Sequence, residues 1–271
     1  MFAGPRMTPG VKQLMIINVV VFVIYALFRG SSLGWLFEEL MLHPPKALFG
    51  GRIWQPLTYM FMHASVGHLL GNMLFLFFFG TNVEQMVGTR KTYEIYVLSG
   101  LGGALATLIV GGLAAAVVPG SFLGALWLAP HLGASGAIYG ITLFWGARLW
   151  NQSANFFLLG EMKIRTFVLI IVGIQLLYLI SQEGGSSYTA HFGGMAAGFA
   201  LGRYGIPDLS MFSLRRVRAN MKHRETERRL NRFQVIDGDG EGPSDNGDDT
   251  AGRPIWLHRP DPKDDDDPII H

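Results

Sequence analysis

The sequence predicts an all-α membrane protein, a bundle of six transmembrane helices followed by a mostly disordered C-terminal tail. Hydrophobic residues make up 49% of the 271 residues and charged residues only 15%, whereas soluble domains carry roughly 25% charged residues. Six stretches are about as long and apolar as a bilayer-spanning helix of about 20 residues requires. No aspartate occurs before Asp208, where the composition changes. We therefore expect a membrane domain over residues 1–206 and a tail over 207–271.

The first apolar stretch, 14–28, has the character of a signal peptide or of a membrane helix. No A-x-A-like cleavage site follows Phe28, so we interpret the stretch as a membrane helix. The fourth and sixth of the six stretches, 135–150 and 188–204, are rich in glycine and alanine, so hydropathy identifies them less clearly than the others. The stretches after the first are about 66–86, 92–118, 135–150, 165–180 and 188–204.

Lysine and arginine predict the orientation of the helices, because cytoplasmic loops of membrane proteins carry an excess of both. The loops 119–133 and 182–187 contain neither residue, whereas loop 29–55 on the same side has three of them together with Glu38 and Glu39. The opposite side collects Arg6, Lys12, Arg90, Lys91, Arg148, Lys163 and Arg165. We expect both termini in the cytoplasm and an integral, multi-pass protein of a bacterial inner membrane.

The tail changes character twice. Its first part, "RRVRANMKHRETERRLNR", is basic, and the later "DGDGEGPSDNGDD" and "DPKDDDDP" are acidic and rich in Gly and Pro. The acidic part has the composition of a disordered segment. The basic part follows the last helix closely enough to contact anionic lipid head groups; the alternative is a solvated tether.

Composition limits the partners and cofactors. The chain has no cysteine, which excludes disulfides and thiolate metal sites. The formal net charge of +2 averages two unlike parts, since residues 1–202 hold 10 Lys and Arg against 6 Asp and Glu, and the remainder holds 12 against 14. We expect no cofactor, no bound metal and no nucleic-acid partner.

Ser135 stands alone among small residues in "HLGASGAIYG", at the start of the fourth stretch. A helix N-terminus presents unpaired N–H groups and the positive end of a dipole, which favours a nearby oxyanion. Gly133 and Gly136 leave the backbone uncovered, so a substrate can approach the hydroxyl. The alternative is an N-cap serine in a glycine-rich packing segment.

His191 lies near the start of the sixth stretch, in "TAHFGGMAAGFALG". A period of 3.6 residues places it on one face with Gly194, Met195, Gly198 and Gly202. Small residues at this spacing let membrane helices pack closely, so the imidazole is expected to face a neighbouring helix. The alternative is a histidine that forms a hydrogen bond across the interface for stability alone.

His63, His68 and Asn72 come from "MHASVGHLLGNM", at the start of the second stretch. His68 and Asn72 are four residues apart and so lie one above the other on a helix face. Both can donate hydrogen bonds within an otherwise apolar helix. The alternative is a polar patch at a helix interface or helix end.

Together these residues supply what acyl transfer needs: a serine nucleophile, a histidine base and donors to an oxyanion. All three sets fall at helix starts on the same predicted side of the membrane. Of the six acids before Asp208, Glu84, Glu94 and Glu161 belong to the cytoplasmic side. Glu183 lies in a loop that could approach His191, but nothing in the sequence places it there. We therefore expect a Ser–His dyad, with Tyr139 one turn after Ser135 packing on the imidazole.

Other membrane protease chemistries fit poorly. A zinc enzyme would use H-E-x-x-H, and "HASVGH" lacks both the spacing and the glutamate. An aspartyl intramembrane protease needs paired aspartates, and residues 1–207 contain none.

These motifs resemble the rhomboid intramembrane serine proteases over roughly residues 11–205. The resemblance rests on "HASVGHLLGN", "GASGAIYG" and "AHFGGMAAG", in this order and at the starts of the second, fourth and sixth helices. It implies a rhomboid-like six-helix bundle and a serine-type endopeptidase. It assigns Ser135 as nucleophile and His191 as general base, with His68, Asn72 and the Ser135 amide as the oxyanion hole.

The resemblance also implies supporting roles. Gly133 would be the first glycine of G-x-S-x-G, Tyr139 the tyrosine on the catalytic histidine, and His63 a histidine that supports loop 29–55. One departure concerns that loop, where the family often has Trp-Arg and this chain has Trp54-Gln55, with Arg52 nearby.

The implied reaction is hydrolysis of peptide bonds in transmembrane segments of membrane proteins, near the extracytoplasmic face. A substrate helix must unwind there because a helix keeps its carbonyls in hydrogen bonds. We expect substrates with helix-weakening residues and a small residue before the cleaved bond. The alternative is a non-enzymatic multi-pass protein, a transporter or a membrane chaperone of similar fold.

Overall fold

Four helical segments are long and apolar enough to cross a bilayer. The computed structural model describes residues 6–156, 160–181 and 188–207. Within these ranges the four candidate spans are Pro9–Phe28, Val66–Val87, Thr89–Val117 and Ile164–Ser181. Many large apolar side chains on these helices are exposed, including Ile16, Leu177 and Leu105, as expected of surfaces that face lipid rather than water.

All six predicted stretches contain helices, and most boundaries agree within a few residues. They are α1 (Pro9–Phe28), α5 (Val66–Phe75) with α6 (Thr81–Val87), α7 (Thr89–Ala106) with α8 (Gly112–Val117), α10 (Ser135–Arg148), α11 (Ile164–Ser181) and α12 (Tyr188–Tyr204). One π-helical turn, Leu76–Gly80, joins α5 to α6, and another, Thr107–Gly111, joins α7 to α8. At 14 and 17 residues, α10 and α12 are shorter than a typical span, so six membrane spans remain a prediction.

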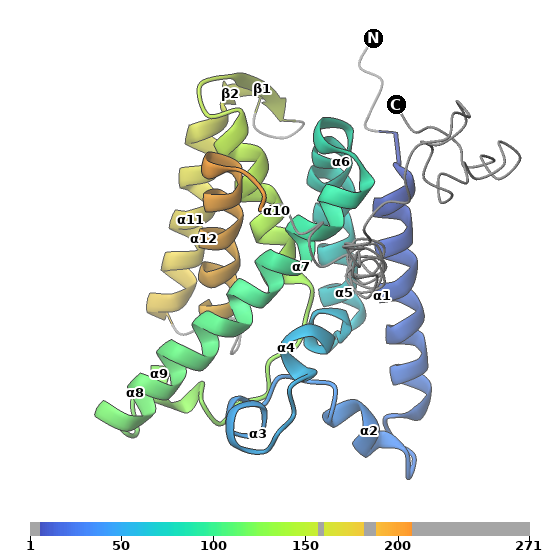
Figure 1. The fold of residues 1–271 in the computed structure, drawn as a ribbon, viewed down its shortest axis with the longest axis vertical. Helices are drawn as coiled ribbons and strands as arrows, with labels where there is room; N and C mark the ends of the chain where they lie inside the picture. The colour runs from blue at the N-terminus through green and yellow to red at the C-terminus, as the bar shows by residue number, and fades with distance from the viewer. Residues whose placement is uncertain (1–5, 157–159, 182–187, 208–271) are drawn as a thin grey trace, which may run out of the picture. The chain divides into compact units, whose positions relative to one another are not determined.

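Several short elements were not predicted. The loop after α1 folds into α2 (Gly34–Glu38), α3 (Pro44–Phe49), α4 (Gln55–Thr58) and the 3₁₀ turn Tyr59–Phe61, and α9 (Phe122–Ala125) follows α8. Strands β1 (Ser153–Phe156) and β2 (Gly160–Lys163) pair antiparallel and are the one departure from an all-α fold in the described ranges. Figure 1 shows α2, α3 and α4 together at one end of the bundle and the hairpin at the other.

Helix α10 lies at the centre of the bundle and packs mainly against α12 and α7. All of its residues except Tyr139 and Arg148 are buried. Glycines of α12 lie directly on its backbone: a Cβ at Gly194 would collide with the carbonyl oxygen of Gly136, and one at Gly198 with that of Gly140. The small residues therefore bring two helix backbones into contact, which fixes the starts of α10 and α12 relative to each other.

The loop 29–55 is held by interactions that replace the expected Trp-Arg pair. The Glu39 carboxylate contacts Arg52 Nε at 2.6 Å and Lys46 Nζ at 3.3 Å, and the hydrogen bond from Arg52 is the main cause that lowers its pKa. Gln55 is fully buried; its side chain accepts from the His43 N–H at 3.0 Å and donates to the Glu39 carbonyl at 3.2 Å. Arg52 thus supplies the cation and Gln55 the buried hydrogen bonds.

This loop is also tied to the segment that precedes α10. Leu42 and His131 exchange two backbone hydrogen bonds of 2.9 Å, and the His131 Nε2 lies 2.8 Å from the Leu126 carbonyl oxygen. Both Leu42 and His131 are fully buried. The loop therefore braces the chain that leads into Ser135.

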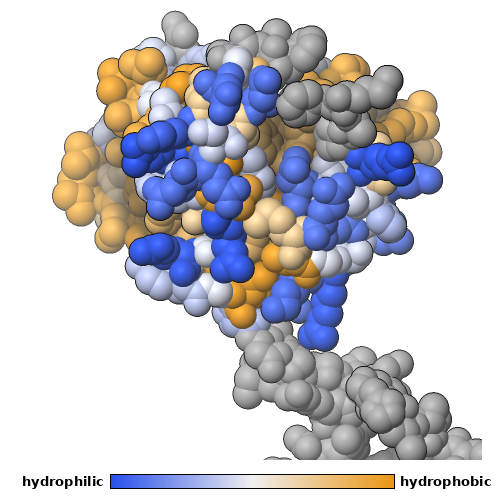
Figure 2. Space-filling model, turned by 90° about the horizontal axis from the view of Figure 1, so that it is seen from above, coloured by the Kyte–Doolittle hydropathy of each residue, from blue (hydrophilic) through white to orange (hydrophobic). Residues whose placement is uncertain are grey.

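The end of the bundle formed by the start of α7 and the end of α12 is polar. In Figure 2 hydrophilic side chains gather over much of this face, and hydrophobic ones lie at its sides and between the hydrophilic groups. This is the arrangement expected where apolar helices leave the lipid for water. The predicted tail beyond Pro207 and the loop 182–187, with Glu183, lie outside the described residues.

Candidate active site

Ser135 is the first residue of α10, and its side chain does not cap that helix. The N-cap position is Ala134, which provides no side-chain hydrogen bond, so the interpretation of Ser135 as an N-cap is wrong. Its Oγ instead lies 2.7 Å from Nε2 of His191 on α12. The side chain is 9% exposed, and its hydrogen bond joins residues 56 positions apart in sequence. This is the nucleophile–base distance that acyl transfer requires.

His191 is held on three sides. Besides Ser135, the Gln175 side-chain oxygen lies 2.8 Å from Nδ1, and the ring of Tyr139 packs at 4.8 Å between ring centroids. The Gln175 side-chain nitrogen donates in turn to the Tyr139 hydroxyl at 2.7 Å. The structure thus brings together the three residues expected from sequence and adds one that was not expected.

Gln175 was missed because the search for a third residue considered carboxylates alone. It lies on α11 and is 6% exposed. The available signal was a lone amide within the apolar run "TFVLIIVGIQLLYLI", since a polar side chain in such a run is costly and commonly functional. In the described residues no carboxylate forms a hydrogen bond with His191.

Gly133 lies between His68 and Ser135. Its φ of +126° belongs to a region that side-chain-bearing residues rarely adopt, and its N–H donates to the Tyr59 carbonyl at 2.9 Å. A Cβ there would lie 2.8 Å from His68 Nε2 and 3.6 Å from Ser135 Oγ. The absence of a side chain therefore leaves the hydroxyl next to the His68 imidazole.

Asn72 lies one turn after His68 on α5 and is 8% exposed. Within the part of the chain that the structure describes, its Nδ2 atom is buried without a hydrogen-bond partner. A buried donor left unpaired is costly, and such donors are concentrated where a ligand or transition state supplies the acceptor. Asn72 therefore has a buried donor free for an acceptor, and its predicted role with His68 as donors to an oxyanion beside Ser135 stays a prediction.

His63 precedes α5 and is fully buried. Its ring packs against that of His68 at 5.1 Å between centroids. Burial, with a smaller effect of the His68 imidazole, lowers the pKa of His63 to about 4. His63 is thus neutral at ordinary pH and packs on His68, and its predicted support of loop 29–55 stays a prediction.

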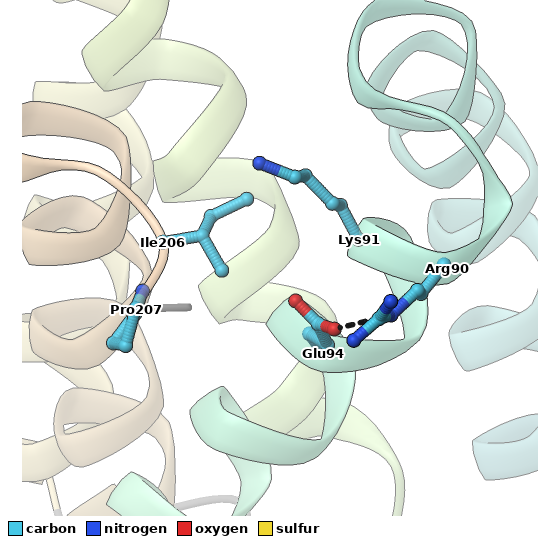
Figure 3. A pocket seen from close by; sticks show the side chains of 5 residues that line it. All are labelled: Arg90, Lys91, Glu94, Ile206 and Pro207. Carbon is cyan, nitrogen blue, oxygen red and sulfur yellow. Dashed lines mark hydrogen bonds and ion pairs between the residues drawn. The ribbon is translucent and has the colours of Figure 1, made fainter. Parts of the chain in front are cut away.

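A separate pocket lies far from these residues. Figure 3 shows Arg90, Lys91 and Glu94 of α7 facing Ile206 and Pro207, which follow α12, around a cavity of about 150 Å³. Glu94 pairs with Arg90 at 3.0 Å. His191 lies near the start of α12 and Ile206 just after its end, 15 residues later. At ~1.5 Å per helical residue, the two are about 22 Å apart. The pocket is therefore not part of the serine site.

No metal site accompanies this arrangement in residues 6–156, 160–181 and 188–207, where no group of three His, Cys, Asp or Glu side chains could hold an ion. In the described residues the hydrogen-bond partners of the His191 ring are Ser135 and Gln175, and Tyr139 packs against the ring.

Comparison with known proteins identifies the family. A rhomboid domain model matches residues 50–208, more than half of the chain. The chain is 30% identical over 192 residues to RHOMBOID-like protein 12, mitochondrial, of Arabidopsis thaliana, covering 69% of this chain and 55% of that protein. It is 30% identical over 171 residues to Rhomboid protease GluP of Bacillus subtilis, covering 61% and 29%.

The chain also matches only part of a human relative. Rhomboid-related protein 3 of Homo sapiens is 28% identical over 214 residues, covering 69% of this chain and 47% of that protein. The chain thus spans between 29% and 55% of the length of these three relatives. Because the matched region includes α5, α10 and α12 with their polar residues, the chain belongs to the rhomboid family.

Proposed function

We propose that this chain is an intramembrane serine endopeptidase that cleaves transmembrane segments of membrane proteins with a Ser135–His191 dyad. The observation that carries the proposal is the 2.7 Å separation of Ser135 Oγ and His191 Nε2. Membership of the rhomboid family and the similarity to a protein named Rhomboid protease GluP support the same conclusion.

The proposed reaction begins when Ser135 Oγ attacks the scissile carbonyl and its proton passes to His191 Nε2. The negative charge then forms on the carbonyl oxygen, where Asn72 Nδ2, His68 and the Ser135 N–H are the available donors. Collapse of this intermediate breaks the C–N bond, and Nε2 gives the proton to the leaving amine. Water then attacks the carbonyl of the acyl-enzyme and gives its proton to Nε2. His191 returns that proton to Ser135 Oγ as the ester bond breaks and the acid product leaves.

The substrate class follows from where the dyad lies. Ser135 and His191 are at the starts of α10 and α12, within or beside the membrane, so the scissile bond must come from a segment unwound near the membrane surface. Gly133 and Gly136 next to Ser135 favour a small side chain before the cleaved bond. Lipid and transmembrane proteins are therefore the proposed partners.

The proposed orientation places the start of α1 and the end of α12 in the cytoplasm and the dyad near the extracytoplasmic face of a bacterial inner membrane. Of the three cations that are exceptions in loop 29–55, Arg29, Lys46 and Arg52, the last two both bind Glu39, so the loop presents less net charge than their number suggests. Contact of the basic juxtamembrane segment with anionic lipid remains part of the proposal.

Cleavage of a transmembrane peptide by the purified protein in liposomes tests the function. The peptide carries a fluorophore pair and glycines near one membrane surface. We expect the wild type to cut, and Ser135→Ala and His191→Ala each to lose about a thousandfold or more of kcat. The exposed Ser153→Ala serves as the matched control and retains wild-type kcat. Wild-type cutting by Ser135→Ala would contradict the proposal, and a silent wild type across a panel of peptides would favour a non-enzymatic rhomboid-like protein.

A further inference from the structure

Gln175 forms the only described side-chain link between α11 and the proposed dyad. Its oxygen lies 2.8 Å from His191 Nδ1 and its nitrogen 2.7 Å from the Tyr139 hydroxyl. The residue is 6% exposed, so water does not replace these partners. Both ends of one amide are therefore used, one on the histidine and one on the tyrosine that packs against it.

The direction of this amide decides which nitrogen of His191 carries the proton. With its oxygen toward Nδ1, the amide accepts a hydrogen bond from Nδ1–H, and Nε2 has a free lone pair for the Ser135 proton. With the amide reversed, its N–H₂ would donate to Nδ1, the proton would sit on Nε2, and His191 could not act as a base. Only the first arrangement is competent for the reaction.

Tyr139 contacts both the amide and the imidazole. Its hydroxyl accepts the hydrogen bond of the Gln175 N–H₂ group while the amide oxygen faces Nδ1. The Tyr139 ring, at 4.8 Å from the His191 ring, restricts the plane of the imidazole. Residues of α10 and α11 thus act together on one imidazole of α12.

We propose that Gln175 is a positioning residue of the dyad, whose amide oxygen keeps the His191 proton on Nδ1 and so leaves Nε2 free to accept the proton of Ser135. The proposal rests on the proposed protease function. During the reaction the Ser135 proton moves to Nε2 and later to the leaving amine. The proton on Nδ1 stays there, and Gln175 neither gains nor loses one.

An amide is suited to this place because it remains neutral. A carboxylate in the corresponding place of a soluble triad stabilises the imidazolium more strongly, but a buried charge without a partner is costly, especially within a membrane. In the described residues no Lys or Arg lies against Gln175 to pair with a carboxylate. The amide orients the imidazole without that cost.

The first test compares Gln175→Leu with the wild type in the liposome assay. Loss of an acceptor that faces a developing positive charge is expected to lower kcat by about 10- to 100-fold, while KM stays within about twofold, because Gln175 does not face the substrate. Gln13→Leu is the matched control, since the Gln13 side chain accepts from Tyr93 on the opposite side of the fold. It should keep wild-type kcat.

Gln175→Glu separates positioning from a merely structural role. This variant keeps an oxygen for Nδ1–H and adds negative charge, so it should recover much of the kcat lost in Gln175→Leu and move the acid limb of the activity profile to higher pH. If Gln175 has only a structural role, the acid limb of the activity profile should not move. The pH profile of Gln175→Glu therefore distinguishes the two roles even if Gln175→Leu fails to fold.

The outcomes also distinguish this inference from the function on which it rests. If the wild type cleaves, Ser135→Ala is silent and Gln175→Leu keeps wild-type kcat and pH profile, the role of Gln175 is wrong and the protease stands. An unchanged acid limb in Gln175→Glu likewise overturns the role of Gln175. If Ser135→Ala cleaves like the wild type, the proposed function fails and this inference fails with it.

Discussion

At His63 a protonated imidazole would be buried without a counter-charge, and this gives the stability a pH dependence. Its pKa of about 4 lies below the ordinary value of 6.5, so between these values the unfolded chain binds more protons than the folded one. The free energy of unfolding should therefore fall as the pH falls from 6.5 towards 4, by at most about 3 kcal/mol from this residue.

Chemical denaturation in detergent at pH 7 and pH 4.5 measures this effect. The aromatic His63→Phe keeps a buried ring and should weaken the pH dependence. An undiminished dependence in His63→Phe would show that another group causes it.

At the residue scale, sequence reasoning works where a polar side chain interrupts an apolar helix, because lipid makes that interruption costly. This is why Ser135, His191, His68 and Asn72 could be selected, and the structure places Ser135 beside His191 and His68. Gln175 satisfies the same criterion, but its partners are set by how α11 packs against α10 and α12. No local pattern reveals that packing.

At the scale of elements, contact between α10 and α12 depends on glycine. A Cβ at Gly198 would collide with the backbone carbonyl of Gly140, whereas one at Gly173 of α11 would meet nothing within 4 Å. Gly198→Ala should lower the free energy of unfolding by about 1–3 kcal/mol, since backbone cannot move aside cheaply. Gly173→Ala should change it by about 1 kcal/mol or less, in the stabilising direction.

Thermal unfolding in detergent compares the two variants, and cleavage by Gly198→Ala reports on the dyad that this contact aligns. Equal stability of Gly198→Ala and Gly173→Ala would mean that the two helices do not pack as closely as described.

The start of α1 is held by one carboxylate. Glu84 of α6, which is 5% exposed, accepts hydrogen bonds from the N–H groups of Gly10 and Val11, each at 2.8 Å, and from the Thr89 hydroxyl at 2.6 Å. The Thr8 hydroxyl also donates to it. Glu84 thus satisfies the unpaired donors of the first turn of α1 and joins α1 to α6 and α7.

Glu84→Gln turns an N–H₂ group toward these donors, and it should lower the free energy of unfolding by about 2–4 kcal/mol. Glu94→Gln breaks only an exposed pair with Arg90 and should cost about 0.5 kcal/mol or less. Denaturant titration of both variants checks the difference. A loss in Glu84→Gln no larger than that in Glu94→Gln would contradict this role.

Elements were predictable where apolar runs are long. The sixth stretch agrees with α12 at both ends, and the second to fifth agree within three residues, whereas α1 begins at Pro9, five residues before the first predicted stretch. The short helices of loop 29–55 and the hairpin β1–β2 were not predictable, because they depend on tertiary contacts such as those of Glu39 and Gln55. The π-helical turns have no distinct sequence signal either, since their residues continue the apolar run.

At the scale of the whole membrane domain, the distribution of apolar surface explains why α10 and α12 differ from the other helices. Helix α1 exposes a row of large side chains, among them Val20, Ile24 and Leu27, whereas α10 is buried by protein on nearly all sides. A central helix needs small residues for close packing rather than a long apolar surface. This is why hydropathy identified α1 and α11 readily and α10 and α12 poorly.

The same arrangement places the proposed dyad in the centre of the bundle, on and beside the buried helix α10. Ser135 and His191 lie on α10 and α12, whose mutual contact is fixed by backbone packing, while α11 contributes Gln175 from the periphery. We expect this central pair to make Ser135 the nucleophilic serine of the protein.

Labelling with a fluorophosphonate probe, followed by peptide mass spectrometry, tests that claim most directly, because the probe reacts only with a serine whose proton is removed by a base. We expect one adduct, on Ser135, that is absent from Ser135→Ala and at least about a hundredfold slower to form in His191→Ala. An adduct on another serine, or labelling of Ser135 at the wild-type rate in His191→Ala, would contradict the account.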